Sequence, residues 1–101
     1  MKEGDWWTFY DGDLARVRVE FYRRKAWVHI VFKNWGMDAM RELKRQFPDL
    51  LKILRSIGYG EVYAFNKPDD KWARFVSMLG FQESYRNNGY IVVSRSSKHV
   101  G

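Results

Sequence analysis

The chain has 101 residues, of which 46% are hydrophobic and 18% aromatic, and its formal net charge is +6. This length corresponds to a single domain, residues 1–101, with enough apolar side chains to form a core. The absence of cysteine excludes disulfides and thiolate metal ligands, and the two histidines, His29 and His99, show no metal-ligand spacing. No apolar run of about 18 residues exists, so we expect no membrane span. The N-terminus has no apolar signal-peptide segment, which together with the missing cysteine indicates a cytoplasmic protein.

Alternating apolar and polar residues predict an antiparallel meander in the first third of the chain. Asp5–Tyr10 is a candidate short strand, and the turn residues 11–13 follow it. Leu14–Tyr22 and Ala26–Phe32 alternate over their whole lengths. We expect these two strands to pair as a hairpin through the polar turn at 23–25.

The apolar period then changes to that of a helix. Met37–Phe47 and Leu50–Ile57 both carry apolar residues at helical spacing, and Pro48 lies between them. Because proline removes a backbone donor and clashes with the preceding turn, we expect a kink or two abutting helices. Gly58 is the expected C-terminal stop.

A strand, a helix and a further strand follow. Glu61–Phe65 is a short apolar run that predicts a buried strand, and Lys71–Leu79 predicts a helix with Asp69 or Asp70 as its cap. Gly80 can end this helix in a left-handed conformation, which lets the next residue turn back into the core.

The remaining residues predict a hairpin. Phe81–Tyr85 and Tyr90–Ser94 read as strands, and the turn at 86–89 contains an Asn-Gly pair that tolerates positive φ. Ser96–Gly101 is expected to be a frayed tail. A strand, a helix and another strand after an antiparallel meander imply a right-handed crossover and a mixed sheet.

This order, and four local patterns, resemble the core of the GNAT (N-acetyltransferase) superfamily. The matching segments are Val62–Phe65, Ala73–Phe75, Leu79–Phe81 and Gly89–Val93. The resemblance implies an α+β fold with a mixed sheet in the order β-β-β-α-β-α-β-β, without the helices that usually precede the family's meander. It also implies two parallel central strands, here Trp27–Lys33 and Glu61–Phe65, that splay apart.

The resemblance implies a site for acetyl-CoA. In the family, the pantetheine arm lies between the splayed strands, and the pyrophosphate lies at the start of the following helix, where backbone N–H groups and the helix dipole favour an anion. Carried over to this chain, the cofactor contacts would come from Phe32, Lys33, Asn34, Trp35, Gly36 and Met37.

Two features of the sequence depart from the family's pattern. Of the glycines that the family has before this helix the chain offers only Gly36, with Trp35 before it and Asp38 soon after. The family's tyrosine proton donor, four residues before the glycine of Gly-Phe, corresponds to Val76, which cannot donate a proton. The catalytic residues are therefore unknown. Groups on the strands that could substitute are Glu20, His29, Glu61, Tyr63 and Tyr85.

Three functions follow from these features. The first is a diverged, non-catalytic component that interacts with protein partners or self-assembles through Trp6, Trp7 and Trp35. This function is implied by a similarity to small GNAT-like proteins of tailed bacteriophages, some of which lie inside the virion. The second is an active acetyl-CoA-dependent N-acetyltransferase that acts on an unknown amine. The third is a nucleic-acid-binding module, for which no motif is present. Its basic residues, scattered along the chain, would include Arg16, Arg18, Arg23 and Arg24.

Overall fold

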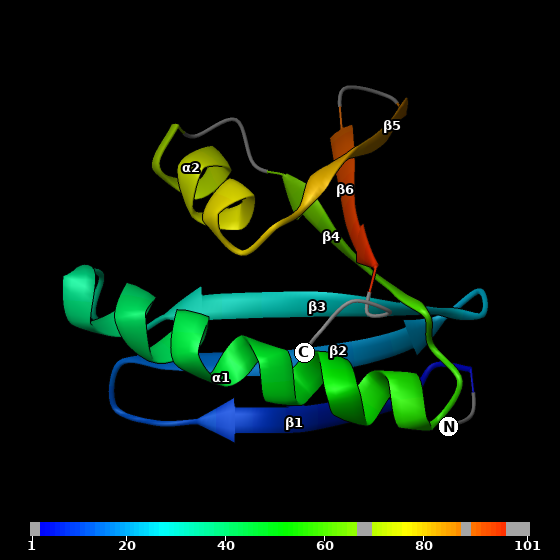
Figure 1. Cartoon of the computed structure of the whole chain (residues 1–101), viewed down its shortest axis with the longest axis horizontal. Helices are drawn as coiled ribbons and strands as arrows, with labels where there is room; N and C mark the ends of the chain where they lie inside the picture. The colour runs from blue at the N-terminus through cyan, green and yellow to red at the C-terminus, as the bar shows by residue number, and fades with distance from the viewer. Residues whose placement is uncertain (1–2, 67–69, 88–89, 97–101) are drawn as a thin grey trace.

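The computed structural model describes residues 3–66, 70–87 and 90–96 (Figure 1). The elements of this part follow the predicted order and confirm the α+β class. They are β1 (Trp6–Asp11), β2 (Ala15–Tyr22), β3 (Lys25–Phe32), α1 (Met37–Ser56), β4 (Glu61–Asn66), α2 (Asp70–Met78), β5 (Gln82–Asn87) and β6 (Tyr90–Ser96). Of the two expected caps of α2, Asp70 is the first residue of the helix, whereas Asp69 lies outside the described residues. The Asn-Gly turn and the tail beyond Ser96 also lie outside them.

The strands form one sheet in the order β1-β2-β3-β4-β6-β5. Neighbouring strands are antiparallel except for β3 and β4, which are parallel, so the predicted mixed sheet is confirmed. The chain crosses from β3 to β4 through α1, and from β4 to β5 through α2. Both crossovers run in the same direction across the sheet. Right-handed connections therefore place both helices on the same face.

The buried cluster of the protein confirms this arrangement of layers. Alternation in β2 and β3 directs every second side chain toward the helices, and side chains of both helices belong to one cluster with them. The strands contribute Ala15, Val17, Val19, Phe21, Ala26, Val28, Ile30, Val62, Ala64 and Val93, the helices contribute Leu43, Phe47, Leu50, Leu51, Leu54, Phe75 and Val76, and the turn after α2 contributes Leu79 and Phe81.

α1 is a single helix of 20 residues with Pro48 inside it, so the expectation of two abutting helices was wrong. A proline in a helix interior costs about 3 kcal/mol. The apolar stripe of α1 continues on both sides of the proline, however, and each buried leucine or phenylalanine contributes about 1.5–3 kcal/mol. Packing on the sheet therefore outweighs the lost backbone bond. The side chains of this stripe, each at most 3% exposed, are Leu43, Phe47, Leu50, Leu51 and Leu54.

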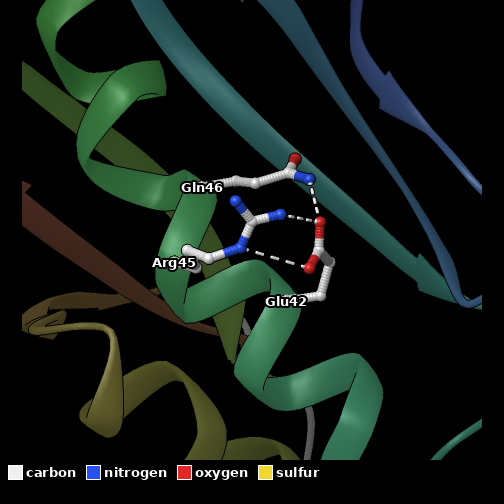
Figure 2. A network of polar contacts seen from close by, with 3 residues as sticks. All are labelled: Glu42, Arg45 and Gln46. Carbon is white, nitrogen blue, oxygen red and sulfur yellow. Dashed lines mark hydrogen bonds and ion pairs between the residues drawn. The ribbon is translucent and has the colours of Figure 1, made fainter.

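The solvent side of α1 is polar. Figure 2 shows Arg45 and Gln46 reaching one carboxylate, that of Glu42, and the Arg45 Nη2 to Glu42 Oε1 distance is 2.6 Å. These bonds lower the pKa of Glu42, and the carboxylate in turn raises the pKa of Arg45.

Neither α1 nor the described part of α2 offers an apolar stretch long enough to traverse a bilayer.

α2 ends in a glycine motif that redirects the chain into the core. Gly80 has φ +91°, and its N–H donates to the Ser77 carbonyl at 2.9 Å, while the Phe81 N–H donates to the Val76 carbonyl at 3.0 Å. This pair of bonds is a Schellman motif. Phe81 is buried, and its ring lies 5.5 Å from that of Phe47 on α1. The turn thus joins α2 to the core beneath α1.

α1 ends in the same motif. Gly58 has φ +103°, its N–H donates to the Arg55 carbonyl at 3.1 Å, and the Tyr59 N–H donates to the Leu54 carbonyl at 2.9 Å. A Cβ at Gly58 would meet no atom within 4 Å, whereas a Cβ at Gly80 would lie 3.1 Å from the Arg95 side chain. Both glycines therefore have positive φ, but only Gly80 has a neighbouring side chain that an added Cβ would approach closely.

We expect Gly80→Ala to destabilise the fold more than Gly58→Ala. Both variants place a side chain at positive φ, which costs about 1 kcal/mol or more, and only the first also displaces Arg95 from the end of α2. Gly36→Ala is the matched control, because Gly36 has extended backbone (φ 171°) and open space around it. Urea denaturation of the three variants measures the order. Equal losses at Gly80 and Gly36 would contradict this explanation.

Candidate cofactor site

The central parallel strands are paired over only a short length. β3 and β4 share the register pairs Ala26–Val62 and Trp27–Tyr63 within the described residues. β3 then continues to Phe32 and β4 to Asn66, and Figure 1 shows the two strands separating toward these ends. This is the predicted splay, and the segment that leads from β3 into α1 begins at it.

The six residues predicted to contact the cofactor do not form one surface. Four of them, Asn34 to Met37, line a hollow of about 220 Å³ together with Leu14, Asp38 and Ala39. Phe32 lies instead on the helix side of the sheet, where it packs against the core cluster. The Lys33 side chain is turned across β2 toward the end of β1, as described next.

Lys33 is held by β1 and by the turn that precedes β2. Its ammonium forms an ion pair with the Asp11 carboxylate. Its backbone N–H and that of Asn34 both donate to the Leu14 carbonyl, at 2.9 and 3.2 Å. The charge and two amides of this segment therefore already have partners within the protein.

Three aromatic rings meet where β3, α1 and α2 converge. The Phe32 ring lies 4.3 Å from the Trp35 ring and 5.0 Å from the Phe75 ring, both edge-on, and the Trp35 and Phe75 rings lie 6.4 Å apart. Such edge-on pairs are favourable beyond the area that they bury. We call this cluster the aromatic bridge. It joins the end of β3 to α2 across the mouth of the splay.

The start of α1 carries its own negative charge. Gly36 is the N-cap residue and has no side chain that could cap the helix, and Asp38 lies in the first turn. An acidic side chain here is stabilised by the helix dipole and by the first backbone N–H groups. Those are the groups that would hold a pyrophosphate, so the Asp38 carboxylate competes with that ligand and repels it.

The candidate proton-transfer groups lie elsewhere. Val76, at the position of the family's proton donor, is buried in the core. His29 Nε2 lies 3.1 Å from the Glu20 carboxylate, and the Tyr63 hydroxyl donates to Glu61 at 3.0 Å. Both pairs occupy the sheet face that the helices leave uncovered. The side chain of Tyr85 lies outside the described residues.

Comparison with solved structures supports the fold. A domain from Methanocaldococcus jannaschii superposes with a TM-score of 0.62 at 14% identity, over 82% of this chain and 56% of that one. The ribosomal-protein-S5-alanine acetyltransferase of Vibrio fischeri has a TM-score of 0.62 at 14% identity, over 87% of this chain and 56% of that one. A proposed acetyltransferase from Sphaerobacter thermophilus gives 0.54 at 13%, over 82% and 60%.

The comparisons show a GNAT-like acetyltransferase fold. No protein-family model and no curated protein matches the sequence. The chain spans about 56–60% of the length of the structures that it resembles. The predicted GNAT resemblance is therefore confirmed at the level of the fold.

The residues present do not suit the acetyl-CoA that this fold implies. Where the fold would hold the phosphates, the first turn of α1 carries an acidic side chain, Asp38, and the segment before it lacks a glycine-rich turn. The pantetheine path, at the splay, is spanned by the aromatic bridge. Sequence reasoning found Trp35 and Asp38 but missed Phe75, because only the packing of α2 against β3 brings that ring to the site.

We expect Lys33→Ala to raise the pKa of Asp11 toward the ordinary aspartate value of about 3.9. The hydrogen bond from Lys33 lowers the folded-state pKa of Asp11. A lowered pKa stabilises the fold above the unfolded-state value, and this stabilisation is lost as the pH falls through the folded pKa. NMR titration of the Asp11 carboxyl measures the shift. Lys44→Ala, which removes an exposed charge from α1, should leave the Asp11 pKa unchanged; equal shifts in both variants would contradict the pairing.

Proposed function

We propose that this protein is a non-catalytic GNAT-like domain that acts by binding a partner. The observation that carries the proposal is the aromatic bridge, which occupies the place where the fold would receive a pantetheine arm. Resemblance to small tailed-bacteriophage proteins would place such a partner within a virion.

The aromatic bridge is costly to open. Phe75 is fully buried and belongs to the core cluster, and Phe32 packs against that cluster. Separating these rings to admit a ligand would expose core surface at about 25 cal/mol per Å². A ligand would have to supply this free energy in addition to the cost of facing the Asp38 carboxylate.

The alternative function is an acetyl-CoA-dependent N-acetyltransferase that acts on an unknown amine. The GNAT-like fold favours it, and the Glu20–His29 pair is its best candidate for a general base. This pair lies on the uncovered sheet face, whereas the aromatic bridge lies on the helix side. The two proposals differ first in whether the cofactor binds.

A thermal-shift titration with acetyl-CoA and coenzyme A separates these functions. If the Kd were about 100 μM, 1 mM ligand would stabilise the fold by about 1.4 kcal/mol and raise the Tm by about 5–10 °C. We expect no rise for the natural sequence. We expect a concentration-dependent rise for the double variant Trp35→Ala with Asp38→Ala, which removes one ring and the carboxylate.

The matched control is Trp6→Ala with Asp13→Ala, which removes an exposed tryptophan and an exposed carboxylate away from the site. This control should not gain a ligand-dependent shift. A saturable rise of the Tm in the natural sequence would overturn the non-catalytic proposal and favour the transferase.

A further inference from the structure

The sheet has one face that no described helix covers. Both helices pack on the inward side chains of β2, β3 and β4, so the alternate side chains of these strands point the other way. The register pair Trp6–Glu20 adds Trp6 of β1 to that second set. We call this surface the open face. Its side chains are Trp6, Thr8, Asp11, Arg16, Arg18, Glu20, Tyr22, Lys25, Trp27, His29, Val31, Glu61, Tyr63 and Phe65.

The open face is rich in exposed aromatic rings. Trp6 is 44% exposed, Tyr22 45% and Phe65 45%, which is unusual for side chains of this size in a small domain. Trp27 stacks on Phe65 with ring centroids 5.0 Å apart and an interplanar angle of 13°. The Tyr63 ring lies 5.4 Å from that of Trp27. These rings form two platforms, one at Trp6 and one at Trp27 with its two neighbours.

Cations lie over the faces of three aromatic rings. The Arg18 guanidinium is 4.7 Å from the centre of the Trp6 ring, and the Lys25 ammonium is 5.3 Å from that of Tyr63. At the hairpin turn, the Arg23 guanidinium is 5.4 Å from the centre of the Tyr22 ring. Each platform therefore carries a positive charge over the face of one of its rings.

The acidic groups near the open face have partners, whereas one cationic donor does not. Glu20 is held by His29, and Glu61 accepts a hydrogen bond from Tyr63. In contrast, the Nε of Arg16 is buried and has no hydrogen-bond partner among the described residues. A buried donor of this kind favours an incoming acceptor oxygen.

We propose that the open face binds single-stranded nucleic acid. Aromatic platforms bordered by cations are the means by which proteins bind single strands, because bases stack on the rings and phosphates pair with the cations. The net charge of +6 has the sign that a polyanion requires. This inference deepens the proposed interaction role by naming the partner's chemistry.

A second copy of the chain fits this surface less well. A two-fold contact places the same patch on both sides, so arginines and lysines of one copy would face those of the other. The carboxylates that could neutralise them, Asp11, Glu20 and Glu61, are already engaged. A phosphate backbone supplies the missing negative charge.

Fluorescence anisotropy with labelled rU20 and dT20 tests the proposal on the full chain. We expect both single strands to bind at 50 mM salt, at least about tenfold more tightly than a 20-base-pair duplex, and to quench tryptophan fluorescence through stacking. Comparison of rU20 with dT20 identifies which nucleic acid is preferred. Equal or tighter binding of the duplex would overturn the single-strand assignment.

Two sets of variants separate stacking from charge. Trp6→Leu and Phe65→Leu keep an apolar side chain but remove a ring, and each should weaken binding by about fivefold or more with the salt dependence unchanged. Arg16→Gln with Arg18→Gln should lower the slope of log K against log salt by about 1.4, since each phosphate contact to a single strand contributes about 0.7. The control, Arg41→Gln with Lys52→Gln, removes two exposed charges from α1 and should change the slope less.

Circular dichroism and melting temperature confirm that each variant is folded. Flat titrations at 50 mM salt would overturn the inference, as would unchanged binding in folded Trp6→Leu and Phe65→Leu variants. An equal loss in the two charge variants would indicate attraction by net charge alone and would also overturn it. The result of the acetyl-CoA titration does not depend on nucleic-acid binding. A failure of the nucleic-acid proposal can therefore be distinguished from a failure of the non-catalytic proposal.

Discussion

The architecture depends on the short parallel contact between β3 and β4. Two register pairs, Ala26–Val62 and Trp27–Tyr63, join the antiparallel meander to the C-terminal half of the sheet. Because the pair is parallel, the chain must cross over the sheet through α1, and this crossover fixes the face on which the core is built. Because the pair is short, the strands are free to separate beyond it. The separation creates the gap in which GNAT-like folds hold their cofactor.

The separation is stabilised from one side by the aromatic bridge. Phe32 comes from the end of β3, Trp35 from the segment before α1 and Phe75 from α2, so the bridge ties together the three elements that border the splay. The rings therefore perform a packing role where these three elements meet. This packing connects the N-terminal meander to α2, which follows it by 38 residues in the chain.

Local patterns in the sequence were sufficient to predict most of the fold. Alternation over Leu14–Tyr22 and Ala26–Phe32 gave the hairpin, and Gly58 and Gly80 marked both helix ends, because these signals depend on neighbours in the chain. The sequence left open whether Pro48 kinks one helix or separates two. α1 is a single helix, because packing on distant strands compensates for the proline. The contact of Phe75 with Phe32 was missed. The two residues are 43 positions apart in the chain, so no local sequence pattern indicates that their rings pack together.

The open face arises because successive side chains of a strand point to opposite faces of the sheet, and the core forms on only one of these faces. In β2 and β3 one set of side chains is apolar and buried under the helices, and the alternate set consists of arginines, aromatic rings and the Glu20–His29 pair. Trp27 is the exception, since it is 8% exposed although it belongs to the open side, and its burial comes from the rings beside it rather than from a helix. Side chains on this face therefore contribute little to the core cluster. Substitutions there leave intact the interface between sheet and helices that holds the fold together.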